Sequence, residues 1–214
     1  MPFITLEGME GCGKSTQARR LAQRLGPAAV VTKEPGGTAI GLAIRQILLD
    51  RSIQGLVPAA ELLLYFADRA QHVAEVMQPA LAQGRLVVCD RYVESSLAYQ
   101  GYGRGLSLEA IRQVAELATG GLRPDLIVLL ELPIEEGLAR VGRRGGHDRM
   151  ESEVREFYER VWSGYQELLA REPSRWVRVS GEGTEDAVAE RLWTMLETRG
   201  FLPGLAGSRS GGTR

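Results

Sequence analysis

Gly8-Met9-Glu10-Gly11-Cys12-Gly13-Lys14-Ser15 is the stretch of this chain that decides its fold. The octapeptide follows an apolar run at Phe3–Glu7 and leads into a helical pattern at Lys14–Leu25. A strand, a glycine-rich turn and a helix N-terminus direct successive backbone N–H groups at one point, where nucleotide phosphates fit. In such a phosphate-binding loop the lysine reaches the β- and γ-phosphates and the serine hydroxyl binds Mg²⁺. The alternative, a chance glycine-rich turn, does not account for these flanks, so we predict a site for a nucleoside polyphosphate that extends to Thr16.

The whole chain has the size and composition of one soluble domain. It has 214 residues, of which 44% are hydrophobic and 25% charged, with a net charge of −1. We therefore predict a domain at 1–202 with a small lid at about 141–151 and a flexible tail at 203–214. The near-neutral charge argues against a nucleic-acid or membrane partner. The sequence has no signal peptide or apolar run of transmembrane length, so we expect a cytoplasmic protein.

Short apolar runs alternate with helical stretches, which indicates an α/β domain with a parallel sheet. The expected strands are Phe3–Glu7, Ala29–Thr32, Leu86–Cys89, Leu126–Leu132 and Trp176–Val179. The expected helices are Lys14–Leu25, Ile40–Leu49, Pro58–Gln83, Leu108–Ala118, Ile134–Arg143, Glu151–Ala170 and Glu185–Thr198. Ligands of such sheets bind at the carboxyl ends of the strands, so the motifs that follow strands are the site candidates.

Asp90 ends an apolar strand, which is where a loop of this kind places an acid near Mg²⁺. We expect Asp90 beside Ser15 if the two strands are neighbours; the alternative is an aspartate that caps a turn. Arg91 follows at once and would meet the nucleotide or a second anion. The stretch 95–105 gathers hydroxyls, an amide and aromatic rings, and we expect it to form a pocket wall for a planar polar ligand.

Two further segments are pocket candidates. The turn at 33–38 follows the second strand and leads into a helix that carries Arg45. Tyr65 and Arg69 are four residues apart, and hence on one helix face, where they could hold a base between stacking and hydrogen bonding. In isolation such a pair also fits a core aromatic next to a solvated charge.

The basic break at 140–151 fits a hinged lid that carries arginines over a phosphoryl group, or a solvated loop.

Taken together, these motifs resemble the thymidylate kinase family over residues 3 to about 196. The resemblance rests on the glutamate-bearing phosphate loop, Glu34-Pro35-Gly36-Gly37, Asp90-Arg91-Tyr92, residues 95–100 and Asp148-Arg149-Met150-Glu151. It implies a doubly wound, five-stranded P-loop kinase fold with a small lid and a homodimer. It also implies transfer of the γ-phosphoryl group of Mg-ATP to dTMP, which gives dTDP for dTTP synthesis.

The resemblance implies a role for each matching residue. Glu10 would receive the 3′-hydroxyl of dTMP, and Arg45 and Arg91 would hold its phosphate. The thymidine pocket would be formed by Glu34, Pro35, Tyr65, Arg69, Ser96, Tyr99 and Gln100. Because the phosphate loop has no arginine, the catalytic arginine would come from the lid, from Arg143, Arg144 or Arg149, and would act with Lys14 and Arg91.

Other functions are less compatible with the sequence. Another P-loop nucleoside monophosphate kinase or a deoxynucleoside kinase is the nearest alternative, and Tyr65, Arg69, Tyr99 and Gln100 favour thymine and deoxyribose over it. A guanine-nucleotide switch needs an asparagine in its base-reading motif, and this sequence contains no asparagine. A regulatory ATP-binding module has no need of two arginines for an acceptor phosphate.

Overall fold

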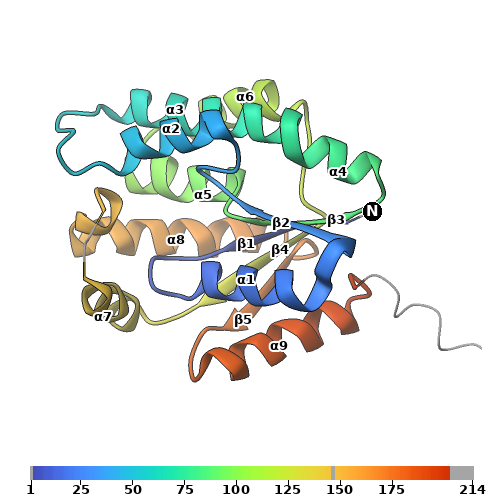
Figure 1. Ribbon diagram of the computed structural model, residues 1–214. Helices are drawn as coiled ribbons and strands as arrows, with labels where there is room; N and C mark the ends of the chain where they lie inside the picture. Colours follow the sequence, from blue (N-terminus) through green and yellow to red (C-terminus); the bar gives the residue numbers. More distant parts are fainter. Residues whose placement is uncertain (1, 146–147, 203–214) are drawn as a thin grey trace, which may run out of the picture.

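The structure, a computed structural model, describes residues 2–145 and 148–202, except for the side chain of Arg144. The tail predicted at 203–214 and residues 146–147 of the predicted lid lie outside the described residues. A five-stranded parallel sheet with strand order β2-β3-β1-β4-β5 forms the centre of the molecule (Figure 1). Its strands are β1 (Phe3–Glu7), β2 (Ala29–Lys33), β3 (Leu86–Asp90), β4 (Leu126–Glu131) and β5 (Trp176–Ser180). All five predicted strands are confirmed, with ends that differ by at most one residue.

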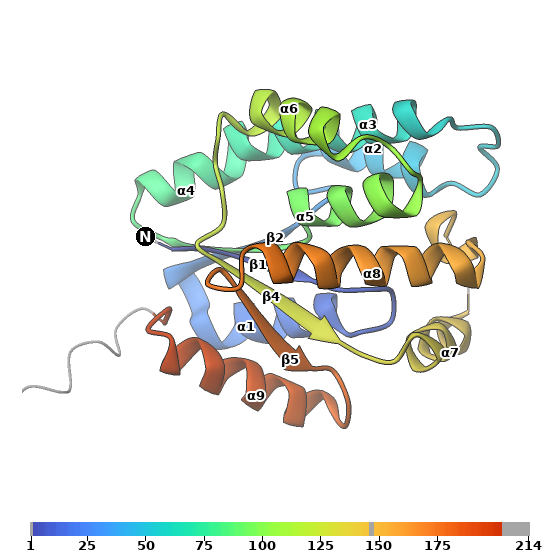
Figure 2. The ribbon, with the colours of Figure 1, turned by 180° about the vertical axis from the view of Figure 1, so that it is seen from behind.

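Helices cover both faces of the sheet, so the predicted doubly wound α/β class is confirmed. The view from behind in Figure 2 shows α1 and α9 on one face and α2, α3, α6 and α8 on the other, while α7 lies beyond the carboxyl end of β4. The helical elements are α1 (Lys14–Leu25), η1 (Gly26–Ala28), α2 (Ala39–Leu49), α3 (Pro58–His72), η2 (Val73–Met77), α4 (Gln78–Ala82), α5 (Val93–Ser96), η3 (Leu97–Gly103), α6 (Leu108–Thr119), α7 (Ile134–Arg144), η4 (Met150–Ser152), α8 (Arg155–Arg171) and α9 (Glu185–Thr198). No helix in the described part of the chain is long and apolar enough to cross a membrane.

The sheet divides the hydrophobic core into two layers, because side chains alternate between the faces of each strand. Ile4, Leu6 and Val128 point toward α1 and α9. Ile127 and Leu129 point to the opposite face, where they pack with aromatic residues of α8 and η3. Burial on both faces explains why the central strands read as continuous apolar runs.

Three segments differ from the predicted helices. The segment Pro58–Gln83 is helical but widens to a π-helix at Val73–Met77. The segment predicted at Glu151–Ala170 starts with a short 3₁₀ turn, and α8 begins only at Arg155. Residues 93–103 form α5 and the π-helical η3, whereas the stretch 95–105 was expected only as a pocket wall. The sequence did not indicate this helix because Gly101 and Gly103 are poor helix formers. The glycines are needed for close packing, since a Cβ at Gly101 would lie 2.4 Å from Leu108 and one at Gly103 would lie 2.6 Å from Phe157.

Candidate active site

A cavity of about 570 Å³ opens at the carboxyl ends of the strands, a size typical of small-molecule sites. The phosphate loop lines one end, and α2, α3 and η3 line the other. The structure brings most of the predicted site residues to this cavity, namely Glu10, Gly11, Cys12, Gly13, Lys14, Ser15, Thr16, Glu34, Pro35, Arg45, Tyr65, Arg69, Asp90, Arg91, Ser96, Tyr99, Gln100 and Arg143. Gly8 and Arg149 do not line it, and the side chain of Arg144 is not described.

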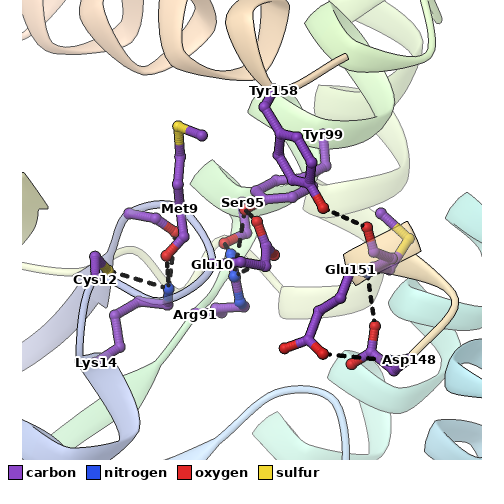
Figure 3. Close-up of polar contacts among 12 residues, drawn as sticks. Met9, Glu10, Cys12, Lys14, Arg91, Ser95, Tyr99, Asp148, Glu151 and Tyr158 are labelled. Atoms are coloured by element: carbon purple, nitrogen blue, oxygen red, sulfur yellow. Dashed lines mark hydrogen bonds and ion pairs between the residues drawn. The ribbon is translucent and has the colours of Figure 1, made fainter. Parts of the chain in front are cut away.

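The phosphate loop has the backbone conformation that its sequence predicts. Gly11 and Gly13 adopt positive φ angles of 73° and 98°, and α1 begins directly afterwards at Lys14. The Nζ atom of Lys14 donates to the carbonyl oxygens of Gly8 at 2.9 Å and Met9 at 2.7 Å (Figure 3). The carbonyl oxygens of the loop therefore hold the lysine ammonium at the loop, and both this charge and the N–H groups of the helix N-terminus favour an anion there.

Ser15 and Asp90 meet because β1 and β3 are adjacent strands. The Ser15 hydroxyl donates to Oδ2 of Asp90 at 2.6 Å. Oδ1 of the same carboxylate is buried and has no hydrogen-bond partner among the described residues. Mg²⁺ prefers oxygen ligands, and the Ser15 hydroxyl together with the unpartnered Oδ1 of Asp90 supplies two of them. The side chain of Asp90 thus turns toward the phosphate loop rather than capping the turn that follows β3.

Arg91 connects the phosphate loop to the far end of the cavity. Its Nη2 lies 2.8 Å from Oε1 of Glu10, and its Nη1 donates to the Ser95 hydroxyl at 3.1 Å (Figure 3). The Tyr99 hydroxyl donates to the other Glu10 oxygen at 2.6 Å. Arg91 is the one non-glycine residue with a positive φ, 74°, in the described part of the chain. Such a conformation costs free energy, and it aims the side chain across the cavity.

The floor of the far end of the cavity is a buried polar network around Arg69 of α3. Arg69 is 1% exposed; its Nε donates to Oε2 of Glu34 at 2.7 Å, its Nη1 to Ser96 and its Nη2 to the Tyr92 carbonyl. It is therefore a buried ion-pair residue and not a solvated charge. His72 Nδ1 lies 2.9 Å from the other Glu34 oxygen. These contacts fix the Glu34 turn beneath the cavity.

Glu34, His72 and Cys89 bring ligand atoms within 4.8 Å of one another, which is the spacing of a metal cluster. Both carboxylate oxygens of Glu34 are already engaged with Arg69 and His72. The Cys89 thiol contacts the Arg91 carbonyl oxygen at 3.0 Å, and burial raises its pKa well above the usual value, which disfavours a thiolate ligand. We therefore interpret this cluster as a hydrogen-bond network.

Arg45 and Tyr65 complete the far end. The Nη1 atom of Arg45 donates to the Pro35 carbonyl at 2.9 Å, which holds the guanidinium along the Glu34–Pro35 turn. Tyr65 is half-buried at the cavity wall, four residues before Arg69 on α3. An aromatic ring and two guanidinium groups around one space fit a planar base that carries a phosphate.

The lid arginines separate into two groups. Arg143 is exposed at the cavity, and Arg140, which the sequence did not single out, lines it as well and donates to the Gly181 carbonyl at 3.2 Å. Arg149 instead lines a second cavity, where its Nη1 lies 2.7 Å from Glu61 and its Nε donates to the Leu48 carbonyl. In this structure the α2–α3 corner, and not the phosphate loop, thus holds Arg149.

Sequence reasoning missed three buried acids behind the site. Glu7 ends β1 and accepts hydrogen bonds from the backbone N–H of Tyr92 and from the hydroxyls of Ser95 and Tyr165. Glu61 and Asp68 lie on α3 and are 0% exposed. The signal for Glu7 was available, since like Asp90 it is a carboxylate at the end of an apolar strand. For Glu61 and Asp68, a helical position alone does not distinguish a buried acid from an exposed one.

Comparison with known proteins points to one family. A family model described as thymidylate kinase matches residues 6–192. Proteins named thymidylate kinase from Synechococcus sp. (strain JA-2-3B'a(2-13)) and Deinococcus radiodurans are 56% and 48% identical to this chain; the alignments cover 92% of it and 95% and 97% of the relatives. A crystal structure of thymidylate kinase from Ehrlichia chaffeensis superposes with a TM-score of 0.75 at 30% identity, over 91% of this chain and 98% of that one. With the phosphate loop at one end of the cavity and paired arginines at the other, these matches show that the chain belongs to the thymidylate kinase family.

Proposed function

We propose that this protein transfers the γ-phosphoryl group of ATP to dTMP in a Mg²⁺-dependent reaction that gives ADP and dTDP. Membership of the thymidylate kinase family supports a phosphotransferase with this acceptor. The observation that carries the proposal is the cavity itself, which has an anion-binding loop at one end and Arg45 and Arg91 at the other. A single nucleotide would leave one of these two anion sites without a phosphate.

Catalysis in this arrangement rests on positioning and charge. The acceptor is a phosphate oxygen that is largely ionised at neutral pH, since the second phosphate pKa is about 6, so no strong general base is needed. This oxygen attacks the γ-phosphorus, and the bond from the γ-phosphorus to the bridging oxygen of ADP breaks. Lys14 and the loop N–H groups hold the donor, while Arg91 and Arg45 hold the acceptor in line.

Ser15 and Asp90 would hold Mg²⁺, because they supply a hydroxyl and a buried carboxylate oxygen without a protein partner. When bound there, the ion neutralises charge on the β- and γ-phosphate oxygens. Mutual repulsion of two polyanions is the main obstacle to this reaction. A Mg²⁺ ion held by Asp90 and the ammonium group of Lys14 would both reduce this repulsion, because each offsets negative charge on the phosphates.

The far end of the cavity has groups for each part of thymidine. The Glu10 carboxylate, which Arg91 and Tyr99 hold, would accept the sugar 3′-hydroxyl. Tyr65 would stack on the base, and Arg69 and Gln100 would meet its edge, with Ser96 and the Glu34–Pro35 turn beneath. Tyr99, against the same carboxylate, would crowd a ribose 2′-hydroxyl and so favour deoxyribose.

For the lid we propose that Arg143 contacts the transferred phosphoryl group, with Arg144 as the second candidate. Arg143 already lines the cavity and is exposed, so a small closing motion of the lid would bring it over the phosphates. Arg149 would first have to leave Glu61 and the Leu48 carbonyl, and we therefore give it an anchoring role in the described conformation.

A homodimer is also part of the proposal. Large apolar side chains are exposed on α2, α3 and α6, which lie on the same side of the molecule (Figure 1), and at the residue directly before α3. They are Ile40, Leu42, Ile47, Val57, Leu63 and Leu117. A face of this kind marks a protein interface, and Leu63→Glu should shift the mass measured by sedimentation to that of a monomer.

For the cellular location we propose the cytoplasm, because the two buried free cysteines fit its reducing conditions.

A substrate panel tests the proposal against the alternative of another nucleoside monophosphate or deoxynucleoside kinase. With Mg-ATP as donor, dTMP should be phosphorylated far faster than dCMP, dAMP, dGMP or thymidine. Preferential turnover of any of these other acceptors would contradict the assignment.

A further inference from the structure

Glu61 is a buried acid that the proposed mechanism does not use. It lies in the first turn of α3, is 0% exposed and receives the side-chain amide of Gln100, whose Nε2 donates to its Oε1 at 2.8 Å. Gln100 lines the main cavity at the end where we place the acceptor base. Glu61 therefore contacts a residue of the base pocket without lining that pocket itself.

The charge state of Glu61 decides what it can do. Burial alone would raise its pKa, but hydrogen bonds from Gln100 and Arg104 and the charge of Arg149 outweigh this and lower the pKa below its usual value. Arg104 and Arg149 lie 3.2 Å and 2.7 Å from its Oε2. Glu61 is thus a carboxylate, and an ionised carboxylate only accepts hydrogen bonds.

An acceptor-only partner fixes which way the Gln100 amide is turned. The two ends of a glutamine amide are nearly isosteric but opposite in hydrogen-bonding character. Because the carboxylate takes the NH₂ end, the carbonyl end is left for the cavity. Among the described residues, no protein group donates to that carbonyl oxygen. The pocket therefore presents an acceptor at Gln100.

We propose that Glu61 is a positioning residue that orients Gln100, so that the pocket selects pyrimidines with a hydrogen on N3. Thymine and uracil carry a hydrogen-bond donor at N3, whereas cytosine carries an acceptor there. With cytosine, the N3 acceptor would therefore lie opposite the carbonyl acceptor of Gln100, and no hydrogen bond could form. A site built for one hydrogen-bond polarity strongly rejects the opposite one, since its buried polar group is left unpaired. This inference rests on the proposed function and deepens it, because it names the group that sets base preference at the acceptor site.

A double-mutant cycle tests the proposal, with dTMP and 5-methyl-dCMP as the matched acceptors, which share the methyl group and differ at N3 and C4. Oε2 of Glu61 receives both arginines, whereas Oε1 receives Gln100 at 2.8 Å and only a longer bond, 3.3 Å, from Arg104. In Glu61→Gln the new carbonyl would therefore take the Oε2 position facing both arginines, and the new NH₂ would face Gln100 and turn its amide around. We expect the ratio of kcat/KM for the two acceptors to fall at least about tenfold, with KM for ATP unchanged. Gln100→Met should lower the ratio similarly, and the double variant no further.

Glu153→Gln is the control, because Glu153 also pairs with Arg104, at 2.6 Å, but is not among the described residues that form a hydrogen bond with the Gln100 side chain. It should keep the wild-type ratio. Loss of charge at Glu61 should lower the melting temperature equally with and without Gln100, whereas its effect on the ratio should appear only with Gln100 present. An unchanged ratio in Glu61→Gln, or losses that multiply in the double variant, would overturn the proposal.

Failure of the two proposals can be told apart. If wild-type protein does not phosphorylate dTMP, the proposed function is wrong; if it does and the Glu61→Gln ratio is unchanged, only the role of Glu61 is wrong. Should Glu61→Gln not fold, a crystal structure of the wild-type protein with dTMP decides the question. Gln100 should keep its contact with Glu61 and place its carbonyl oxygen on N3–H, and a Gln100 rotated away from either group would overturn the proposal.

Discussion

Glu10 and Arg91 form an ion pair, with 2.8 Å between Oε1 and Nη2, that links the phosphate loop to the segment after β3. The two residues are 81 positions apart in the chain, and the pairing of β1 with β3 brings them together. Burial alone would lower the pKa of Arg91, but Tyr99 and Glu10 raise it well above the usual value, so the guanidinium stays charged. One preformed pair thereby offers an acceptor for a sugar hydroxyl and a cation for a phosphate.

Arg91→Ala should weaken dTMP binding much more than ATP binding. Removal of a hydrogen-bonded charge from such a contact costs about 2–5 kcal/mol, which corresponds to a rise in the dTMP dissociation constant of about thirtyfold to a few thousandfold. Isothermal titration with dTMP and with a non-hydrolysable ATP analogue measures both effects. Arg85→Ala, which removes an arginine outside the cavity, is the control, and equal losses for both nucleotides in Arg91→Ala would refute the acceptor role.

Lys14→Ala should reduce kcat by about a thousandfold, because it removes the cation that the loop directs at the β- and γ-phosphates. The fold should persist, since the contacts of Nζ are with carbonyl oxygens and a thiol of its own loop. Circular dichroism checks folding, and a coupled ADP assay checks turnover. Activity within tenfold of wild type would rule out the assignment of the donor site.

Arg69→Lys should lower the preference for dTMP over dCMP and also destabilise the fold. A lysine keeps a charge near Glu34 but loses the planar fork that joins Glu34, Ser96 and the Tyr92 carbonyl. We expect a loss of about 2–3 kcal/mol in unfolding free energy, less than for a change that leaves Glu34 unpaired. Competition between the two acceptors, measured well below the melting temperature, gives the preference. If destabilisation occurs without a change in preference, Arg69 supports the turn and does not read the base.

Much of the fold and of the phosphate end could be predicted from the sequence, and the reasons are local. β3 is an apolar run that ends at Asp90, and the glycine pattern of residues 8–15 dictates a loop and a helix start. The placement of Ser15 beside Asp90 needed only the further assumption that their strands are adjacent. Such features depend on residues close together in the chain.

What the sequence could not predict depends on packing between distant segments. The glycines of η3 conceal a helix because their role is to let α6 and α8 approach, which is a tertiary reason. Arg149 belongs to a basic break that suggests a phosphate ligand, yet Glu61 and the Leu48 carbonyl hold it elsewhere. In isolation Arg69 also fits a solvated charge, and its burial depends on Glu34, Ser96 and the Tyr92 carbonyl, which come from other segments of the chain.

Asp90→Asn should raise the Mg²⁺ concentration needed for half-maximal activity by about tenfold or more, because it removes the charged ligand and leaves the Ser15 hydroxyl. Chelation of Mg²⁺ with EDTA should abolish turnover in wild-type protein and excess Mg²⁺ should restore it. Asp186→Asn, at an exposed surface pair with Arg20, is the control and should follow the wild-type curve. Coincident Mg²⁺ titrations for wild type and Asp90→Asn would mean that Asp90 does not act on the ion.

Glu94 should make the protein less stable as pH rises. Its Oε2 is buried and has no hydrogen-bond partner among the described residues, and burial, together with the charge of Glu7, raises its pKa from 4.5 to about 7. Because the folded pKa lies above the unfolded one, protonation favours the folded state, and this stability is lost between about pH 4.5 and 7. Glu94→Gln should flatten this loss and stabilise the protein at pH 8 by up to about 3 kcal/mol.

Urea unfolding of wild type and Glu94→Gln at pH 5 and pH 8 measures the difference. Glu109→Gln, on the exposed face of α6, is the control and should show the wild-type pH dependence. Parallel pH profiles for wild type and Glu94→Gln would show that Glu94 is not the group that titrates.

The central claim is that two nucleotides bind end to end, with the phosphate loop at one end of the cavity and Arg45 and Arg91 at the other. The affinity of thymidine and adenosine joined through five phosphates tests it most directly, since only a protein with both sites can hold both ends at once. We predict that this compound binds at least about a hundredfold more tightly than ATP or dTMP alone, because the second end binds intramolecularly. An affinity no higher than that of ATP would contradict the claim.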